Sequence, residues 1–462
     1  MPFYGRLKKA LPAGSAQEIM RKRTIVGLRR LRKALAEHFP KDTNRMTTVR
    51  IGTWNIREFG NNKHGGRETY EPLYYMAEII SNFDIAAIQE VRDDMTEFRQ
   101  LRDILGPDWD YIATDVTDGG AGNGERMVFL FNRNRVRFRN IAGELTLPDG
   151  RKVLASFGER IKLENGIALK LPAGVELSGI YDAKSEAGSD GAIKLTEDVE
   201  IALPADTWLA LPKGSALAVA KGTEVSRPAG TKGKVALGIP QDTVEGKNFR
   251  LRFPGEALDE SFKQFARTPF IVSFQAGWMK IDLATVHIYF GDNEDEKLLA
   301  QRKREIFRLT EALGARAAKE MKANPDNTVL TGLLGDFNII SAEHETMQAL
   351  EANGFEVPEQ IRSIPGSNVP QDKAYDQIAF WEPKRKRGHV RVDVRGAGVF
   401  DYYDHVYRLD ERLTYQPERS EGAYKTWRTF KMSDHLPMWI ELSSDFSDAY
   451  LDACDAVDPV EA

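Results

Sequence analysis

The sequence predicts an α/β fold interrupted by a β-rich insert, and three observations support this prediction. Of the 462 residues, 42% are hydrophobic and 29% are charged. This composition is that of a folded globular chain and excludes a wholly disordered, collagen-like or coiled-coil protein. From residue 46 onward, short β-like runs alternate with helical stretches, the rhythm of an α/β protein. Residues 143–254 interrupt that rhythm with a segment dense in glycine, proline and other turn residues.

Residues 1–45 are predicted to form a basic, amphipathic helical extension. They hold 12 Lys and Arg against three acids, and apolar residues recur at helical spacing through residues 17–39. We favour a helix that packs on its own domain with its basic side in solvent. A nucleic-acid contact and a membrane-surface contact are the alternatives.

The predicted strands are short apolar runs rich in β-branched and aromatic residues, and the predicted helices carry apolar residues three and four positions apart. Before the insert, the elements in order are a strand at 49–56, a helix at 70–83, a strand at 84–91, a helix at 95–105, a strand at 109–114 and an extended run at 125–140. After the insert, they are a strand pair at 268–288, a helix at 294–321, a strand at 328–337, a helix at 342–353 and strands at 375–381 and 436–442.

The insert has a period of eight residues that begins at Leu195 and continues through Leu203 and Leu211. Turn residues alternate with apolar ones, which suits either a meandering β-domain or a solenoid-like stack. We expect a surface accessory without catalytic groups, and recognition of a substrate or of an unknown protein partner is the alternative. Residues 443–462 contain six acids and no base, and we expect a loosely attached tail.

Charge, cysteine content and hydropathy restrict the function classes. The net charge of −5 gives no global basic character, so any anion site must be built locally. The single Cys454 cannot close an internal disulfide and has no neighbours for a zinc site. No apolar run reaches membrane-spanning length, and the N-terminal residues do not resemble a secretory signal. We therefore expect a cytoplasmic protein.

Polar residues stand at or just beyond the ends of nearly all the predicted strands, in seven short motifs. In chain order, they are TWNIREFG with Asn55, IQEV with Glu90, GERMVFLF with Glu125, TVHI with His287, GDFN with Asp336 and Asn338, YDQI with Asp376, and MSDHLP with Asp434 and His435. Each motif alone is weak, but their joint order is informative. Strand ends on a rigid sheet let such groups converge, and their carboxylate and amide oxygens suit Mg²⁺ or Mn²⁺. The sequence contains no P-loop, HExxH, GxSxG or paired CxxC motif.

This series resembles the endonuclease/exonuclease/phosphatase superfamily, the divalent-metal phosphoesterases related to deoxyribonuclease I, over roughly residues 48–142 and 264–442. The resemblance implies a four-layer α/β/β/α sandwich of the deoxyribonuclease I type, formed by residues 46–142 and 255–442, with residues 143–254 as a β-rich insert.

The resemblance also implies roles for these residues. Glu90, Asn55 and Asp434 are the expected ligands of Mg²⁺, with Mn²⁺ able to substitute. Asp376 holds His435, either a base or a phosphate binder, and Glu125 pairs with His287. Asp336 orients water, and Asn338, expected on the same side of an extended segment, stabilises the oxyanions. Arg267, Asn338 and Asn55 are the expected phosphate contacts.

We therefore expect a divalent-metal-dependent phosphodiesterase, an endonuclease that hydrolyses DNA with an activated water. The alternative is a phosphatase or phospholipase C-like hydrolase of inositol-phosphate or sphingolipid headgroups, because the superfamily takes several substrates on similar sites. A catalytically silent scaffold is a third hypothesis. The secreted deoxyribonucleases have disulfides and a signal sequence, so an extracellular role is not expected. The basic runs 133–139 and 384–387 are candidates to line a polyanion groove.

Overall fold

The computed structural model describes residues 1–40, 44–60, 70–116, 124–146, 265–291, 295–323, 329–382 and 392–455, together with the backbone of short strands between residues 150 and 252. The chain divides into two compact units, Met1–Thr146 with Phe265–Ala462 and Leu147–Gln264. The second unit corresponds closely to the predicted insert.

The first unit is built on two six-stranded mixed sheets. The first has the order β22-β23-β1-β2-β4-β3, formed by Val394–Val399, Met438–Ser443, Thr48–Phe59, Ile85–Arg92, Glu125–Asn132 and Trp109–Ala113. The second has the order β20-β21-β19-β18-β17-β5, formed by Phe355–Glu356, Asp376–Trp381, Val329–Asp336, Met279–His287, Phe270–Ala276 and Arg137–Glu144. The pairs β1–β2 and β18–β19 are parallel, and the other neighbours are antiparallel.

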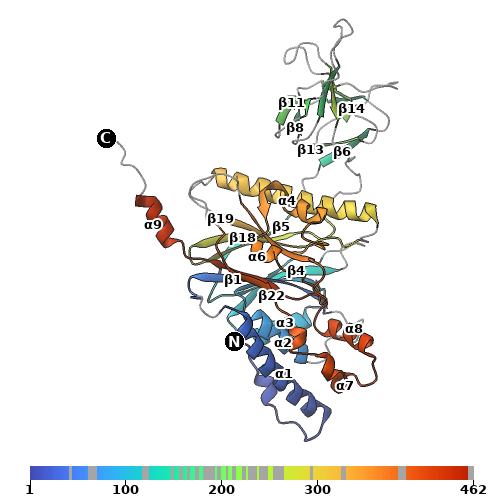
Figure 1. Ribbon diagram of the computed structural model, residues 1–462. Coiled ribbons are helices and arrows are strands. Elements are labelled where there is room, and N and C mark those ends of the chain that lie inside the picture. Colours follow the sequence, from blue (N-terminus) through green and yellow to red (C-terminus); the bar gives the residue numbers. More distant parts are fainter. Residues whose placement is uncertain are drawn as a thin grey trace. The chain divides into compact units, whose positions relative to one another are not determined.

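The two sheets pack face to face, and helices cover their outer faces (Figure 1). Between the sheets, the ring of Phe274 lies 5.6 Å from that of Phe129 and 5.4 Å from that of Phe131. The first sheet is covered by α1 (Ala16–His38), α2 (Tyr70–Ile80) and α3 (Thr96–Leu105), and the second by α4 (Glu296–Ala323) with α5 (Glu345–Leu350). The predicted four-layer α/β/β/α sandwich is thus confirmed.

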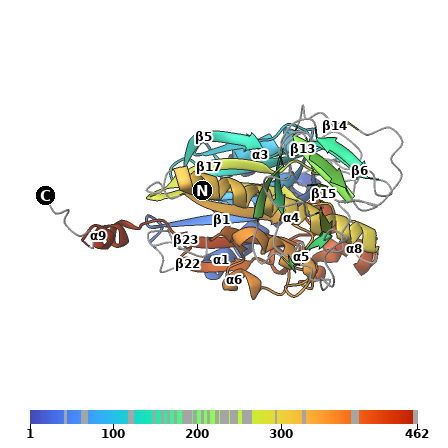
Figure 2. The same ribbon diagram turned by 90° about the horizontal axis from the view of Figure 1, so that it is seen from above.

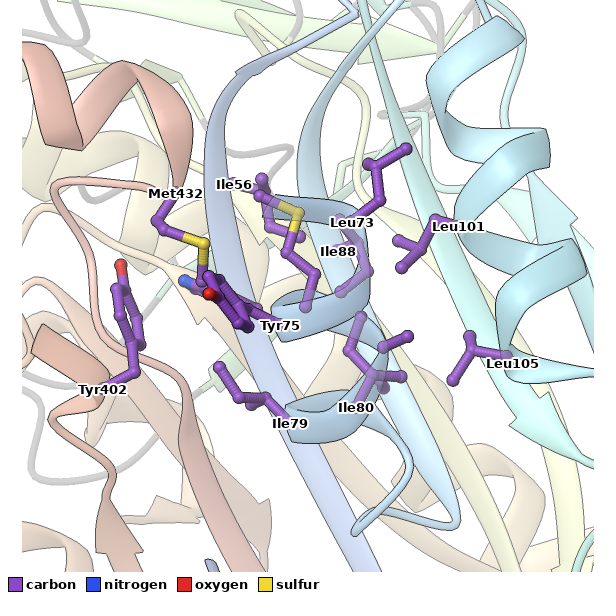
Figure 3. Close-up of a cluster of buried hydrophobic side chains, with 14 of the residues drawn as sticks. Ile56, Leu73, Tyr75, Ile79, Ile80, Ile88, Leu101, Leu105, Tyr402 and Met432 are labelled. Carbon is purple, nitrogen blue, oxygen red and sulfur yellow. The ribbon is translucent and has the colours of Figure 1, made fainter. Parts of the chain in front are cut away.

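Apolar side chains of α1, α2 and α3 form one core with the outer face of the first sheet. Figure 3 shows Ile79 and Ile80 of α2 and Leu101 of α3 packed toward Ile56 and Ile88 of the sheet, and all five are fully buried. From α1, the core receives Leu28, Leu31 and Leu35. The N-terminal helix therefore packs on its own domain, which is the interpretation that we favoured, while Lys22, Arg29 and Lys33 stay exposed.

Two segments differ from the prediction. The run 125–140 is two strands, β4 and β5, which lie in different sheets because the turn between them carries the chain from one sheet to the other. The acidic segment is only partly a tail: Ser443 pairs with Thr48, and α9 (Ser447–Asp455) places Tyr450 5.7 Å from Trp278. In Figures 1 and 2, α9 extends beyond the ends of the sheets.

Several short elements had no predicted counterpart. Besides β20 and β22, these are η1 (Gly5–Lys8), η2 (Ala352–Gly354), α6 (Glu359–Arg362), η3 (Tyr402–Asp404), η4 (Leu409–Glu411), α7 (Arg412–Tyr415) and α8 (Glu421–Lys431). Among the described residues, no helix combines the length and apolar character needed to cross a membrane.

The second unit contains one seven-stranded sheet, β10-β9-β16-β15-β12-β7-β14, and the strand pairs β11-β8 and β13-β6. The strands are β6 (Gly150–Ala155), β7 (Arg160–Leu163), β8 (Ile167–Leu171), β9 (Glu176–Ile180), β10 (Ile193–Lys194), β11 (Val199–Leu203), β12 (Thr207–Ala210), β13 (Ser215–Ala220), β14 (Val225–Ser226), β15 (Leu237–Gly238) and β16 (Asn248–Arg252). Because β6, β7 and β8 pair with β13, β12 and β11 in nested order, these strands do not form a meander.

Candidate active site

The predicted site residues converge at one edge of the two sheets because of the strand directions. Asn55 and Glu90 lie near the carboxyl ends of the parallel strands β1 and β2, and His287 and Asp336 end the parallel strands β18 and β19. The antiparallel strands β4 and β21 begin at the same edge. The first residue of each strand pairs with the neighbouring strand at this edge. Glu125 of β4 pairs with Arg92 of β2, and Asp376 of β21 pairs with Asp336 of β19.

Asn55 joins the two sheets through its side-chain amide. Its Nδ2 donates to Glu90 Oε1 and to Asp336 Oδ2, each at 2.9 Å. Its Oδ1 is buried and has no hydrogen-bond partner among the described residues. One amide therefore holds two carboxylates from different sheets and leaves an oxygen available to a ligand.

Glu90 adopts an unusual backbone conformation, with φ of 60°. A register shift between β2 and β4 falls between Ile88 and Val91, so Glu90 sits in a bulge that directs its side chain into the site. Burial alone raises the pKa of Glu90, but the charge of His287, the Glu58 N–H and the Asn55 amide outweigh burial and lower this pKa to about 2. Glu90 is therefore ionised at neutral pH.

His287 is held by Glu125, as the sequence predicted. Its Nδ1 lies 3.1 Å from Glu125 Oε2, and Glu125 Oε1 accepts a hydrogen bond from Arg267 Nε. A carboxylate partner places the proton on Nδ1, so Nε2 is the free acceptor, 3.7 Å from Asp336 Oδ2. Burial, and secondly the charge of Arg267, lower the pKa of His287 to about 4, so the ring is neutral at pH 7.

His435 has the opposite electrostatic environment. Its Nδ1 lies 2.7 Å from Asp376 Oδ2, which also accepts a hydrogen bond from Ser367 Oγ at 2.7 Å. Its Nε2 lies 3.6 Å from Asp336 Oδ2. Burial lowers the pKa of His435, but the carboxylates of Asp376 and Asp336 outweigh burial and raise it well above its usual value. This ring is therefore protonated at neutral pH.

The site thus contains two imidazoles of opposite protonation that face one carboxylate oxygen. Two groups of side chains place their potential ligand atoms within 4.8 Å of one another: Glu90, Glu125 and His287, and Asp336, Asp376 and His435. In both groups a carboxylate already holds the imidazole Nδ1. We therefore interpret them as acid–base pairs rather than as metal sites.

Asp434 and Asn338 differ from the predicted arrangement. The Asp434 side chain is 44% exposed and lies 3.3 Å from Arg57 Nη1, and it belongs to neither group. The premise of an extended segment at Asp336 and Asn338 is wrong, because β19 ends at Asp336 and Asn338 has φ of 52°. The Asn338 backbone N–H bonds Asp336 Oδ1, and its side-chain amide donates to Ile288 O at 2.8 Å.

Glycine is required immediately before Asp336. Gly335 has φ of 140°, and a Cβ there would lie 2.2 Å from the carbonyl oxygen of Val286. Strands β18 and β19 thereby approach closely at their ends, where His287 and Asp336 are neighbours.

Sequence reasoning missed three residues that shape the site. Ser367 supports Asp376, and Ser433 Oγ donates to Asn55 O at 2.7 Å while it accepts from His435 N at 3.0 Å. Ser433 stood in the motif MSDHLP, so its position was a usable signal. Arg57 stacks on Phe430, 3.9 Å from the ring centroid, and bonds Thr429 Oγ1, which links β1 to α8.

The donor set fits a hard divalent cation. The ionised Glu90 carboxylate and the buried, unpartnered Asn55 Oδ1 are oxygen ligands, which Mg²⁺ and Mn²⁺ prefer. Arg267, the predicted phosphate contact, is buried with its Nη1 unpartnered among the described residues, so one donor of its guanidinium is available.

The structure describes one of the two basic runs, residues 133–139. Residues 384–387 lie outside the described residues. In the run 133–139, Arg133 bonds Pro107 O, and Arg135 bonds Asp84 and Thr48 O. These arginines follow the end of β4 that is opposite Glu125.

Comparisons with known proteins found similarity to phosphoesterases. The chain is 33% identical to deoxyribonuclease-1 of the dog, Canis lupus familiaris, over 93 residues, which cover 19% of this chain and 31% of the canine enzyme. The matched part is thus about a third of that relative. No protein-family model matches the chain.

Three solved structures are similar to this chain. An endonuclease/exonuclease/phosphatase family protein from Bacteroides thetaiotaomicron has a TM-score of 0.41 and 13% identity and covers 87% of this chain and 99% of its own. The mannosyl-6-phosphatase Bt3783 of that organism has a TM-score of 0.41 and 13% identity, covering 85% and 99%. TDP2 of D. rerio with a single-strand DNA product has a TM-score of 0.38 and 10% identity, covering 86% and 99%.

The first unit has two stacked sheets with two histidine–carboxylate pairs at one edge. These features and the deoxyribonuclease-1 match confirm the predicted resemblance to the endonuclease/exonuclease/phosphatase superfamily.

Proposed function

We propose that this protein is a divalent-metal-dependent phosphodiesterase, an endonuclease that hydrolyses DNA phosphodiester bonds with an activated water. One observation carries the proposal: the Nε2 atoms of His287 and His435 lie 3.7 and 3.6 Å from the same oxygen, Asp336 Oδ2. A neutral and a charged imidazole on the same small site are a matched base and acid.

In this mechanism, His287 is the base and His435 is the acid. The unprotonated Nε2 of His287 accepts a proton from the attacking water, which Asp336 orients. The Nε2–H of His435 faces the phosphate and gives its proton to the leaving oxygen. Glu125 and Asp376 keep the two rings in these tautomers through their Nδ1 atoms. Arg267 contributes a donor to the phosphate oxygens. Both N–H groups of Asn55 are engaged by Glu90 and Asp336, so its proposed phosphate contact requires release of one of those bonds. One N–H of the Asn338 amide donates to Ile288 O, so its proposed stabilisation of the oxyanions uses the second N–H.

The proposed metal ligands are Glu90, Asn55 and Asp434. These residues would hold Mg²⁺ or Mn²⁺, which would supply charge neutralisation at the phosphate oxygens and Lewis acidity. Asp434 is the least prepared of the three because it is ion-paired with Arg57.

Plasmid cleavage tests the proposal. The full chain should convert supercoiled plasmid to nicked and linear forms with Mg²⁺ or Mn²⁺ but not with EDTA. His435→Ala should abolish cleavage. His405→Gln, which alters a ring stacked on Phe400 and paired with none of these carboxylates, should not. An intact plasmid with either metal would overturn the assignment to DNA.

One observation favours the headgroup hydrolase as a second candidate. Phe290, three residues after His287, is 49% exposed, and its ring centroid lies 6.2 Å from that of Tyr375, next to Asp376. An exposed aromatic at the rim suits a lipid interface as well as an unstacked base. Hydrolysis of sphingomyelin or inositol phosphates by a preparation that leaves plasmid intact would establish this candidate.

A further inference from the structure

Two charged residues of α4, Arg302 and Glu305, have no exposed surface at all. Charged side chains are almost never fully buried unless they are bonded, because removal of a charge from water is costly. The two residues are three positions apart and therefore lie on one face of the helix. Neither belongs to the groups that we assign to the chemistry.

Arg302 binds the main chain of the segments that follow β18 and β19. Its Nη1 donates to Asn338 O at 2.9 Å, and its Nη2 donates to Gly291 O at 3.1 Å. Its guanidinium lies 5.3 Å from the centroid of the Phe290 ring. One rigid fork thus fixes the backbone of Asn338 and that of the segment that leaves His287.

Glu305 binds two further main-chain groups at the same edge. Its Oε1 accepts a hydrogen bond from Ala266 N at 3.1 Å, and its Oε2 accepts one from Tyr289 N at 3.4 Å. Ala266 precedes Arg267, and Tyr289 is two residues after His287. The two oxygens of one carboxylate therefore tie the Arg267 segment to the His287 segment.

We propose that Arg302 and Glu305 are positioning residues that set the relative placement of Arg267, His287 and Asn338; this inference rests on the proposed function. Four hydrogen bonds from one helix face reach three segments that β17, β18 and β19 do not hold by strand pairing. Apolar residues of similar volume would pack α4 without the cost of burying charge. The charges are instead used to fix backbone groups whose side chains form the reacting edge.

Conservative substitutions in the full chain test this role. Arg302→Lys keeps the charge but replaces the fork with a point donor, and Glu305→Gln keeps the shape but loses one of two acceptor oxygens. Each should lower kcat for bis(p-nitrophenyl) phosphate by roughly tenfold or more, with KM changed less than about twofold. A fall in kcat with little change in KM indicates that the substrate still binds but that the reacting groups are misplaced.

Thr310→Val is the matched control. Thr310 is also fully buried on α4, but its hydroxyl donates to Phe307 O and Ala349 O, away from the three segments. This variant should lose thermal stability without loss of kcat. If Arg302→Lys and Glu305→Gln retain kcat within about twofold, or if Thr310→Val loses kcat equally, the positioning role is overturned.

Hydrogen exchange separates this inference from the proposed function. In Glu305→Gln, the amides of Ala266 and Tyr289 should exchange at least about tenfold faster, while amides inside β19 keep their protection. A wild-type chain without phosphodiesterase activity would end the proposed function, whereas unchanged exchange at both amides would end this inference even in an active enzyme.

Discussion

The two histidines of this site have opposite charges at neutral pH, and burial together with the surrounding charged groups decides which ring is protonated. Burial, and secondly the charge of Arg267, leave His287 neutral, whereas the carboxylates of Asp376 and Asp336 outweigh burial and keep His435 protonated. The carboxylates that bond the two rings, Glu125 and Asp376, are both buried, so solvent does not screen their electrostatic effect on the rings. At the residue scale, function therefore depends on the partner of each ring as much as on the ring.

Asp376→Asn tests this dependence directly. The amide cannot stabilise the charged ring, so the pKa of His435 should fall and kcat at neutral pH should drop by about 10²- to 10⁴-fold. Ser367→Ala, which removes only the hydroxyl bonded to Asp376 Oδ2, should cost about tenfold or less. Steady-state kinetics on bis(p-nitrophenyl) phosphate measure both. Equal activity of Asp376→Asn and the wild type would contradict the assignment of His435 as a charged acid.

A second residue-scale prediction concerns Asn55. Asn55→Ala removes the unpartnered Oδ1 and the donor shared by Glu90 and Asp336, leaving two carboxylates in closer repulsion. We expect Mn²⁺ affinity, measured by electron paramagnetic resonance or calorimetry, to fall at least about tenfold. Thr53→Val, on the same strand with its hydroxyl bonded to Gln89, is the control and should bind Mn²⁺ as the wild type does. Unchanged Mn²⁺ affinity in Asn55→Ala would remove Asn55 from the metal ligands.

The identities of the site residues could be predicted, but some of their contacts could not. Asn55, Glu90, His287 and Asp336 stand at strand ends, and a periodic apolar pattern locates strand ends in sequence. The ion pair between Arg57 and Asp434 joins residues that are hundreds of positions apart, and no local pattern reports it. Likewise, the positive φ of Asn338 follows from bonds to Ile288 and Arg302, which tertiary packing supplies.

At the scale of elements, α2 carries a buried carboxyl group that should make stability depend on pH. Glu78 is 5% exposed, and its Oε1 has no partner among the described residues. Burial raises its pKa from 4.5 to about 7. Between these two pH values the folded chain binds a proton that the unfolded chain releases, so this group lowers the free energy of unfolding as pH rises, and the loss is complete above pH 7.

Glu78→Gln should remove this dependence. The variant should gain stability over the wild type by about 2 kcal/mol more at pH 8 than at pH 5, a difference measurable by urea unfolding. Glu37→Gln, at an exposed position of α1, should change stability equally at both pH values. A stability difference that is the same at pH 5 and pH 8 for Glu78→Gln would show that this carboxyl group titrates normally in the folded protein.

Regular elements with a clear period were predictable, whereas changes of sheet were not. The helix expected at 294–321 is α4, Glu296–Ala323, because its apolar side faces one sheet throughout. The run 125–140 reads as one strand because β4 and β5 have the same local pattern, and only the packing of two sheets separates them. Helix α8 was missed because its buried residues, Tyr424 and Arg428, include only one apolar side chain.

At the scale of the whole molecule, the insert joins the first unit at a place where the chain ends are already close. Strands β5 and β17 pair antiparallel, with Glu144 opposite Phe270, and Leu145 N donates to Pro269 O at 2.8 Å. The segment from residue 147 to 264 therefore leaves and re-enters the first unit in the manner of a hairpin loop. Loop-closure entropy grows only slowly with loop length, so such a position tolerates a large insertion.

Replacement of residues 147–264 by a short Gly-Ser linker should consequently leave a folded first unit. We expect its thermal midpoint to stay within about 5 °C of the full chain's, since no strand of either six-stranded sheet is lost. We also expect kcat/KM for bis(p-nitrophenyl) phosphate to stay within about threefold, because every group assigned to the chemistry remains. Calorimetry and kinetics on both forms measure this. If the shortened chain folds but is inactive on this small diester, the insert contributes to the reaction, whereas a loss confined to plasmid DNA would assign the insert to substrate recognition.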